Sequence, residues 1–288
     1  MNDTSPAATA DAPQTPAAKP AGVKEVKKEK EEGSFLWFLV KLALAVLVFR
    51  TCIFAPFNIP SESMLPRLLD GDYLLASKWN YGISNYSLPF GIHIFPSGRI
   101  FASQPERGDV VIFKAPPLDD EDYIKRVIGL PGDQIQMKGG VVFINGAPVK
   151  KVRIKDFEVT QSPNTRCYSP EFVATAKDGS AICRYPQFRE TLPNGVSYNV
   201  LDFGPRPQDD TEPWLVPDGK MFLMGDNRDD SLDSRFPAEP DRGVGIVPQD
   251  NLVGKATVMM WSTDGSSSWF KPWTWFTAAR WSRIGGTF

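Results

Sequence analysis

The chain has 288 residues, with 32 Lys and Arg against 34 Asp and Glu, so its formal net charge is −2. This balance leaves no overall basic field and argues against nucleic acid as a partner. The 26 prolines and 23 glycines punctuate short segments throughout the chain, which favours a mainly β protein over a helical one.

The first 33 residues form a separate compositional zone. Ala and Pro dominate as far as Ala21, and Lys and Glu then prevail as far as Glu32. Because large apolar side chains are too few to offset the entropy cost of ordering, we predict that residues 1–33 are disordered.

An apolar run from Phe35 to Phe57 follows this tail. It exceeds the ~20 residues that cross ~30 Å of hydrocarbon, and Lys41 and Arg50 can extend their charged ends toward the headgroups. A cleaved signal peptide is the alternative, but the run is too long and no Ala-x-Ala site follows it at once. We therefore predict a retained transmembrane helix over residues 34–57.

Basic residues predict the orientation of this anchor. Five lysines precede it, and the first basic residues after it are Arg67 and Lys78. The positive-inside rule then places the tail in the cytoplasm and the rest of the chain on the other side. In an exported domain Cys167 and Cys183 could form a disulfide, but two thiols leave the question open. No Cys/His cluster with zinc spacing is present in the sequence, and neither a metal nor a cofactor is expected.

Turn signals divide the exported part into short strands. Gly-Asp pairs at Gly71, Gly108 and Gly132 each precede an apolar or alternating run, and Asn145-Gly146 separates two apolar runs as in a β-hairpin. Further strands are predicted at 220–224 and 255–261, and an extended hairpin at 82–103.

The pattern of apolar and alternating runs weakens between residues 147 and 217, where polar loops are common. We therefore predict an antiparallel catalytic β core from residues 58–133 and 218–288, interrupted by a smaller inserted β domain over residues 134–217.

Serines at positions 61 and 63, bracketed by Pro60 and Pro66, directly follow the apolar run. A serine nucleophile needs a base. The one histidine, His93, lies in an apolar, glycine-flanked stretch, where a packed or surface histidine is the favoured interpretation. The other known base is a lysine kept neutral by burial, whose pKa must fall from ~10.4 to about 7–8.

Lys125 is the lysine in the most apolar setting. In a strand, alternation puts it on one face with Tyr123 and Val127, opposite Ile124 and Arg126. A gatekeeper lysine on an edge strand is the alternative interpretation. Further on, a polar segment from Met224 to Arg235 follows a strand. Its spacing fails for a calcium loop, because the sixth position is Ser231 and the twelfth is Pro237, so we interpret it as a loop that supports a site.

Together these segments resemble the bacterial type I signal peptidases (leader peptidases), a Ser/Lys dyad family. The resemblance rests on five motifs that occur in order after the anchor: Pro60-Ser61-Glu62-Ser63-Met64-Leu65-Pro66, Arg107-Gly108-Asp109-Val110-Val111-Ile112-Phe113, Tyr123-Ile124-Lys125-Arg126, Gly129-Leu130-Pro131-Gly132-Asp133, and Gly225-Asp226-Asn227-Arg228 through Ser231 to Arg235. It implies a signal-peptidase/repressor-protease-like β fold and an endopeptidase that removes signal peptides from exported preproteins.

The resemblance also implies roles for single residues. Ser63 would be the nucleophile and Lys125 the general base, while the Ser61 hydroxyl and the Ser63 backbone N–H would form the oxyanion hole. Ser231 would orient the Lys125 amine. Residues that would brace the site are Arg126, Asp226, Asp233 and Arg235. Residues that would line small pockets for Ala-like side chains at −1 and −3 are Phe57, Ile59, Met64, Leu68, Tyr123 and Ile124.

Three residues depart from the family pattern: Glu62 where Gly is common, Arg67 where Thr is common, and Asp230 where Asn is common. Asp230 is expected to raise the pKa of Lys125. The resemblance implies a single-pass protein of the bacterial inner membrane with its catalytic domain on the periplasmic side. An aromatic C-terminal stretch, which includes Trp273, is expected either to rest on the lipid bilayer or to pack as an ordinary strand and helix.

Other functions remain open at this stage. A conjugation-linked Ser/Lys processing peptidase or a self-cleaving repressor would use the same dyad, although the anchor disfavours the repressor. A membrane-tethered binding module with inert serines belongs to a different class.

Overall fold

The computed structural model describes residues 25–88, 96, 98–240, 242–268 and 270–288. Residues 1–24, and the part of the predicted hairpin that holds His93, lie outside the described residues. The first element, α1 (Glu25–Cys52), begins within the zone predicted to be disordered, so the prediction is wrong for residues 25–33. Lys and Glu, which dominate this stretch, are both strong helix formers, and this propensity outweighs the low hydrophobicity.

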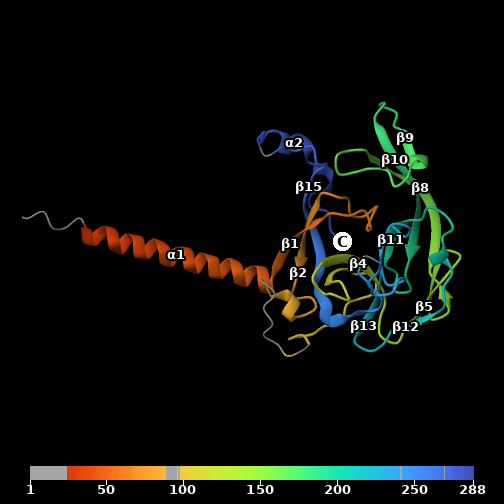
Figure 1. The fold of residues 1–288 in the computed structure, drawn as a ribbon, viewed down its shortest axis with the longest axis horizontal. Helices are drawn as coiled ribbons and strands as arrows, with labels where there is room; N and C mark the ends of the chain where they lie inside the picture. Colours follow the sequence, from red (N-terminus) through yellow and green to blue (C-terminus); the bar gives the residue numbers. More distant parts are fainter. Residues whose placement is uncertain (1–24, 89–95, 97, 241, 269) are drawn as a thin grey trace, which may run out of the picture. The chain divides into compact units, whose positions relative to one another are not determined.

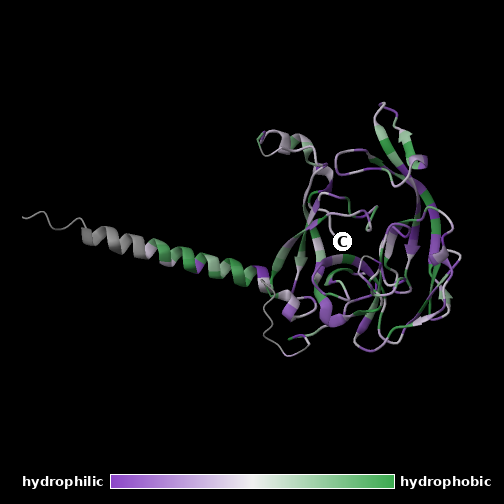
Figure 2. Cartoon of the chain, viewed as in Figure 1, coloured by the Kyte–Doolittle hydropathy of each residue, from purple (hydrophilic) through white to green (hydrophobic). Residues whose placement is uncertain are grey.

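The C-terminal part of α1, Ser34–Cys52, has a mean hydropathy of 2.0 and is long and apolar enough to cross a membrane. Figure 2 shows predominantly hydrophobic colours along this part of the helix. The predicted anchor extends too far, because α1 ends at Cys52 and a strand begins at Phe54. Pro56 cannot continue a helix, and the backbone of this segment pairs instead with the next strand.

Residues 47–288 form one compact unit built on three antiparallel sheets. The largest has seven strands in the order β1-β2-β15-β3-β4-β13-β14. Of these, Figure 1 labels β1, β2, β15, β4 and β13. Its strands are β1 (Phe54–Ile59), β2 (Asp72–Ser77), β3 (Val110–Lys114), β4 (Asp122–Gly129), β13 (Lys220–Met224), β14 (Val247–Pro248) and β15 (Leu252–Ser262).

Two four-stranded sheets come entirely from the segment between β4 and β13. One contains β5 (Gln134–Lys138), β6 (Val141–Ile144), β7 (Ala147–Pro148) and β12 (Trp214–Leu215), and the other contains β8 (Lys150–Thr160), β9 (Val173–Thr175), β10 (Ala181–Thr191) and β11 (Ser197–Leu201). The chain order thus follows the predicted insertion, but the division into a core and a separate inserted domain stays a prediction.

Helices are short outside α1 in the described part of the chain. They are α2 (Thr274–Ala278) and the single 3₁₀ turns η1 (Asn85–Ser87), η3 (Pro170–Phe172), η4 (Pro207–Asp209), η5 (Gln249–Asn251) and η6 (Trp281–Arg283). The mainly β architecture predicted from the sequence is confirmed, as are the strands expected after the Gly-Asp pairs. Gly71, Gly108 and Gly132 all adopt positive φ angles, a conformation that glycine reaches without a steric penalty.

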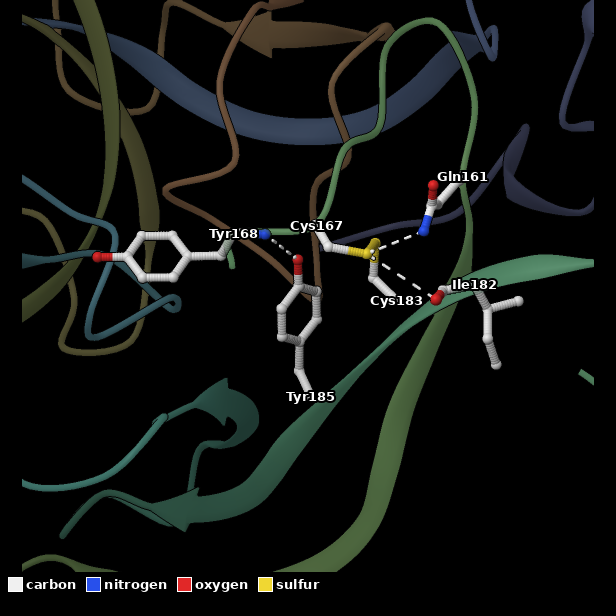
Figure 3. Close-up of a disulfide and its surroundings, with 6 residues drawn as sticks. All are labelled: Gln161, Cys167, Tyr168, Ile182, Cys183 and Tyr185. Atoms are coloured by element: carbon white, nitrogen blue, oxygen red, sulfur yellow. Dashed lines mark hydrogen bonds between the residues drawn. A yellow bond between two sulfur atoms is a disulfide. The ribbon is translucent and has the colours of Figure 1, made fainter. Parts of the chain in front are cut away.

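A disulfide joins Cys167 to Cys183, which settles the pairing that the sequence left open (Figure 3). Next to it the Tyr185 hydroxyl accepts a hydrogen bond of 2.9 Å from the backbone N–H of Tyr168. Cys183 and Tyr185 belong to a buried cluster that also contains Leu65 and Leu69. The disulfide therefore stabilises the wall against which the segment after Ser63 packs.

Candidate active site

Ser63 and Lys125 lie far apart in the sequence but are directly hydrogen-bonded. The Lys125 Nζ lies 2.7 Å from the Ser63 Oγ, and the two residues are only 4% and 8% exposed. Ser63 follows β1 in a series of tight turns, where the Leu65 backbone N–H donates to the Glu62 carbonyl at 3.0 Å. The structure therefore brings together the two residues that the sequence singled out as nucleophile and base.

Lys125 lies within β4, between β3 and β13, and not on an edge strand. Burial lowers the pKa of its amine to about 8, although the negative charges of Asp233, Asp230 and Asp226 act in the opposite direction. Asp230 thus raises the pKa of Lys125 relative to a neutral residue, as expected from the sequence. Because β4 is not an edge strand, the alternative interpretation of Lys125 as an edge-strand gatekeeper is excluded.

Ser61 lies on the exposed side of the same turn. Its Oγ is 3.4 Å from the Ser63 Oγ, so the hydroxyl can reach a group bound at the nucleophile. The role of Ser61 as an oxyanion donor, together with the Ser63 backbone N–H, stays a prediction.

A cleft of about 420 Å³ opens over the two residues. Four of the six predicted pocket residues line it: Phe57, Ile59, Tyr123 and Ile124. The other two, Met64 and Leu68, do not line the cleft, because the turns after Ser63 direct them into the buried cluster beneath it, where they pack with Ile59 and Ile124. Their contribution to a pocket stays a prediction that requires the cleft to deepen.

The polar loop after β13 supports the site through two buried ion pairs. Arg126 and Asp226 form a bidentate pair with distances of 2.7 and 2.6 Å, and Asp233 and Arg235 form a second with both distances at 2.9 Å. Burial alone would raise the pKa of Asp233, but the Arg235 guanidinium and the hydrogen bond from the Gly225 backbone lower it overall. The Asp233 carboxylate therefore stays charged and acts on the Lys125 amine.

Ser231 lies close to the nucleophile segment but does not bond to Lys125 in this structure. A Cβ added to Gly225 would lie 2.2 Å from the Ser231 Oγ and 2.5 Å from the Ser63 carbonyl oxygen, so the three residues are in close contact. The Ser231 Oγ is buried and has no hydrogen-bond partner within the described residues. The role of Ser231 in orienting the Lys125 amine therefore stays a prediction.

Two residues of this loop were missed at the sequence level. Asn227 fixes the nucleophile segment, because its backbone N–H donates to the Ser63 carbonyl at 3.1 Å and its side-chain amide to the Glu62 carbonyl at 3.2 Å. Gly225 leaves the space in which Ser231 approaches Ser63. Their position in the run of mostly polar residues after β13 was the available signal, but the sequence does not indicate a partner for either.

A third missed contact joins the loop to the segment that forms β10. Arg228 donates to both carboxylate oxygens of Glu190 at 2.6 and 2.5 Å, and Glu190 also accepts from the Tyr198 hydroxyl at 3.0 Å. All three residues are buried. The loop that supports Lys125 is thus bonded to the region predicted to be an insertion.

Glu62 and Asp230, two of the residues that depart from the family pattern, both line the cleft. Burial, followed by the charges of Asp230 and Asp70, raises the pKa of Glu62 to about 7. Burial also raises the pKa of Asp230, while Lys125 lowers it. Among the described residues no group of three His, Cys, Asp or Glu side chains could hold a metal ion.

A serine hydroxyl bonded to a desolvated lysine, in a cleft on an antiparallel sheet, defines a class of protein: a hydrolase with a Ser/Lys site. The family model described as "Signal peptidase, peptidase S26" matches residues 33–261. The signal peptidase I of Rickettsia prowazekii (strain Madrid E) is 39% identical over 244 residues, which cover 82% of this chain and 81% of the relative. That of Rickettsia akari (strain Hartford) is 37% identical over 246 residues, with coverage of 82% and 81%.

The solved structure of a signal peptidase I from Enterococcus faecalis V583 covers 54% of this chain and 98% of its own, with 23% identity and a TM-score of 0.29, too low to add to the assignment. The family model and the relatives suffice: the chain belongs to the signal peptidase family, peptidase S26, and is a membrane-anchored serine endopeptidase that cleaves signal peptides.

Proposed function

We propose that Ser63 and Lys125 carry out the cleavage as nucleophile and general base. The observation that supports this assignment is the 2.7 Å bond between a buried amine and a buried hydroxyl. An amine whose pKa is about 8 is largely neutral in mildly alkaline solution and can accept the hydroxyl proton. No other group is then needed to activate the serine.

The reaction follows in two stages. The neutral Lys125 Nζ takes the proton from the Ser63 Oγ as this oxygen attacks the scissile carbonyl, and the Ser61 hydroxyl and Ser63 N–H receive the oxyanion. The ammonium of Lys125 then returns the proton to the leaving amine, which leaves an acyl-enzyme on Ser63. A water molecule, deprotonated by the same amine, hydrolyses the ester and frees the serine.

We propose that the substrate binds as an extended strand, with Ala-like side chains at −1 and −3. The cleft is bordered by residues 57–59 of β1, an outer strand of the seven-stranded sheet, and by Pro60 after it. An outer strand offers unpaired backbone groups to an added peptide. Phe57, Ile59 and Ile124 line the cleft with apolar side chains, which suit methyl groups at −1 and −3.

This specificity is tested with a preprotein in which Ala at −1 is replaced by Leu. We expect kcat/KM to fall by about 10–200-fold, because a hydrophobic pocket discriminates by only a few kcal/mol when methylenes are added. Replacement at −2, which points to the opposite face of an extended peptide, serves as the control. Equal cleavage of the Ala and Leu substrates would exclude a small −1 pocket.

We propose that the chain spans the bacterial inner membrane once, with its N-terminus in the cytoplasm and the catalytic unit on the periplasmic side. The apolar part of α1 is long enough for one span, and the lysines that precede it favour the cytoplasmic side. Ser63 then follows the end of α1 at Cys52 by 11 residues, which keeps the site close to where preproteins leave the bilayer.

We propose the lipid bilayer as a second partner, in contact with the aromatic side chains of the stretch near the C-terminus. These side chains are unusually exposed: Phe270 at 94%, Trp273 at 64%, Phe276 at 66% and Trp281 at 55%. Aromatic side chains favour the headgroup zone. Two of these rings, Phe276 and Trp281, stack with their centroids 6.2 Å apart, and the Trp275 indole N–H donates to the Ser268 carbonyl at 3.0 Å.

A chain that begins at residue 53, after the anchor, is therefore expected to float with vesicles of phosphatidylethanolamine and phosphatidylglycerol. We expect Trp273→Ala to lower the bound fraction several-fold, because about 2 kcal/mol of apolar burial is lost. Phe101→Ala, which removes an exposed aromatic ring outside the stretch, is the control. The proposed contact with the bilayer would be contradicted if the unsubstituted chain did not float, or if the Trp273 variant floated equally well.

A further inference from the structure

A second cavity, of about 850 Å³, lies apart from the catalytic cleft and is lined by neither Ser63 nor Lys125. Its walls come from the segment after the nucleophile, from the start of β3, from β10 and β11, and from the C-terminus. Six basic side chains line it, against two acidic ones: Arg67, Arg107, Arg126, Arg189, Lys255 and Arg283. Basic side chains therefore outnumber acidic ones on its walls, in a chain whose net charge is −2.

Four of the six basic groups already have a carboxylate partner. These ion pairs are Arg107–Asp133 at 2.8 Å, Arg126–Asp226 at 2.6 Å, Lys255–Asp109 at 2.6 Å and Arg283–Asp72 at 2.5 Å. Their positive charges are largely compensated within the fold, so they shape the cavity without needing a ligand.

Arg67 and Arg189 form no ion pair within the described residues. The Arg67 guanidinium lies 5.1 Å from the centre of the Phe288 ring, and the Arg189 Nε donates to the Asn199 Oδ1 at 3.2 Å. Burial and then the charge of Arg126 lower the pKa of Arg67; Arg283 adds to this and Asp226 opposes it. Both guanidinium groups thus keep N–H donors available for an anion.

We propose that this cavity binds a phosphate group through Arg67 and Arg189. A carboxylate has two oxygens and satisfies one guanidinium fork, whereas a phosphate offers further acceptor oxygens and can bridge two forks. Ser197 and Asn199 add polar groups on the same wall. The ligand is either the phosphodiester of an anionic lipid headgroup or free phosphate, since both present the same chemistry to the two arginines.

The test uses the full-length protein in an uncharged detergent and measures binding by calorimetry. The probes are inorganic phosphate, dihexanoyl phosphatidylglycerol and a glutamate-rich peptide. We expect saturable binding of phosphate or the lipid that is at least about tenfold weaker in the double variant Arg67→Gln/Arg189→Gln. Arg184→Gln, which removes an exposed arginine of β10 outside the cavity, should retain the affinity.

The stronger of the two phosphate probes identifies the source of the group. Each single variant is measured as well, so that an unstable double variant does not decide the result. Equal affinity in the arginine variants and the unsubstituted protein would overturn the proposal, as would binding of the acidic peptide alone or no saturable binding of either phosphate probe.

Discussion

Lys125→Ala is expected to lower the rate of preprotein cleavage by about 10²–10⁴-fold, the range that a positioned general base contributes. The alanine leaves the Ser63 hydroxyl without the amine that lies 2.7 Å away, and a serine alone is a weak nucleophile. Ser63→Ala should abolish the acyl-enzyme and reduce cleavage at least as far. The measurement is single-turnover cleavage of a purified preprotein by full-length enzyme in detergent.

The chain offers a matched control in a second buried lysine. Lys78 is 6% exposed, and burial lowers its pKa to about 8, but its amine donates to the backbone carbonyl of Ser87 at 2.9 Å and does not line the catalytic cleft. Lys78→Ala and His93→Ala should therefore retain most of the activity of the folded protein. Undiminished cleavage by Lys125→Ala would exclude the dyad.

Glu190→Ala is expected to lower the free energy of unfolding by about 3–5 kcal/mol, because it leaves the buried Arg228 guanidinium without a counter-ion. The Tyr198 hydroxyl loses its acceptor at the same time. Since Arg228 belongs to the loop that supports Lys125, cleavage should also weaken at temperatures below the unfolding transition. Denaturant unfolding followed by tryptophan fluorescence measures the first effect.

The control for this variant is Glu158→Ala. Glu158 pairs with Arg184 at 3.0 Å on the same sheet, but both side chains are more than one third exposed, so removal should cost no more than about 1 kcal/mol. Equal unfolding free energies for Glu190→Ala and Glu158→Ala would mean that the buried pair does not hold the loop against β10.

Much of the fold could be predicted because local signals agree with it. The Gly-Asp turns, the Asn145-Gly146 hairpin and the apolar strands all appear where short-range chemistry places them. Lys125 was identified because a charged side chain within an apolar strand conflicts with burial unless it has a function. Ser63 was identified as the nucleophile from its position after the anchor in the sequence and from the resemblance to a family.

The remaining features depend on contacts between distant segments. The Arg228–Glu190 pair joins residues whose side chains are unremarkable in the sequence, and Asn227 gains its role only when the loop meets the nucleophile. Met64 and Leu68 follow Ser63 closely, but turn geometry sends them into the core and not to the cleft. The end of α1 was misplaced because the apolar run continues unbroken into β1, and composition alone does not distinguish the two.

The most direct measurement is an NMR titration of the Lys125 side chain in full-length protein with ¹³C-labelled lysine, with its signal assigned by its loss in Lys125→Ala. We predict a pKa of about 8, and a lower value in Asp230→Asn, because that change removes a negative charge that favours the ammonium. The rate of cleavage should rise with pH through the same value. A titration near the ~10.4 of a solvated lysine would contradict the account, because the amine would then be charged when the serine must lose its proton.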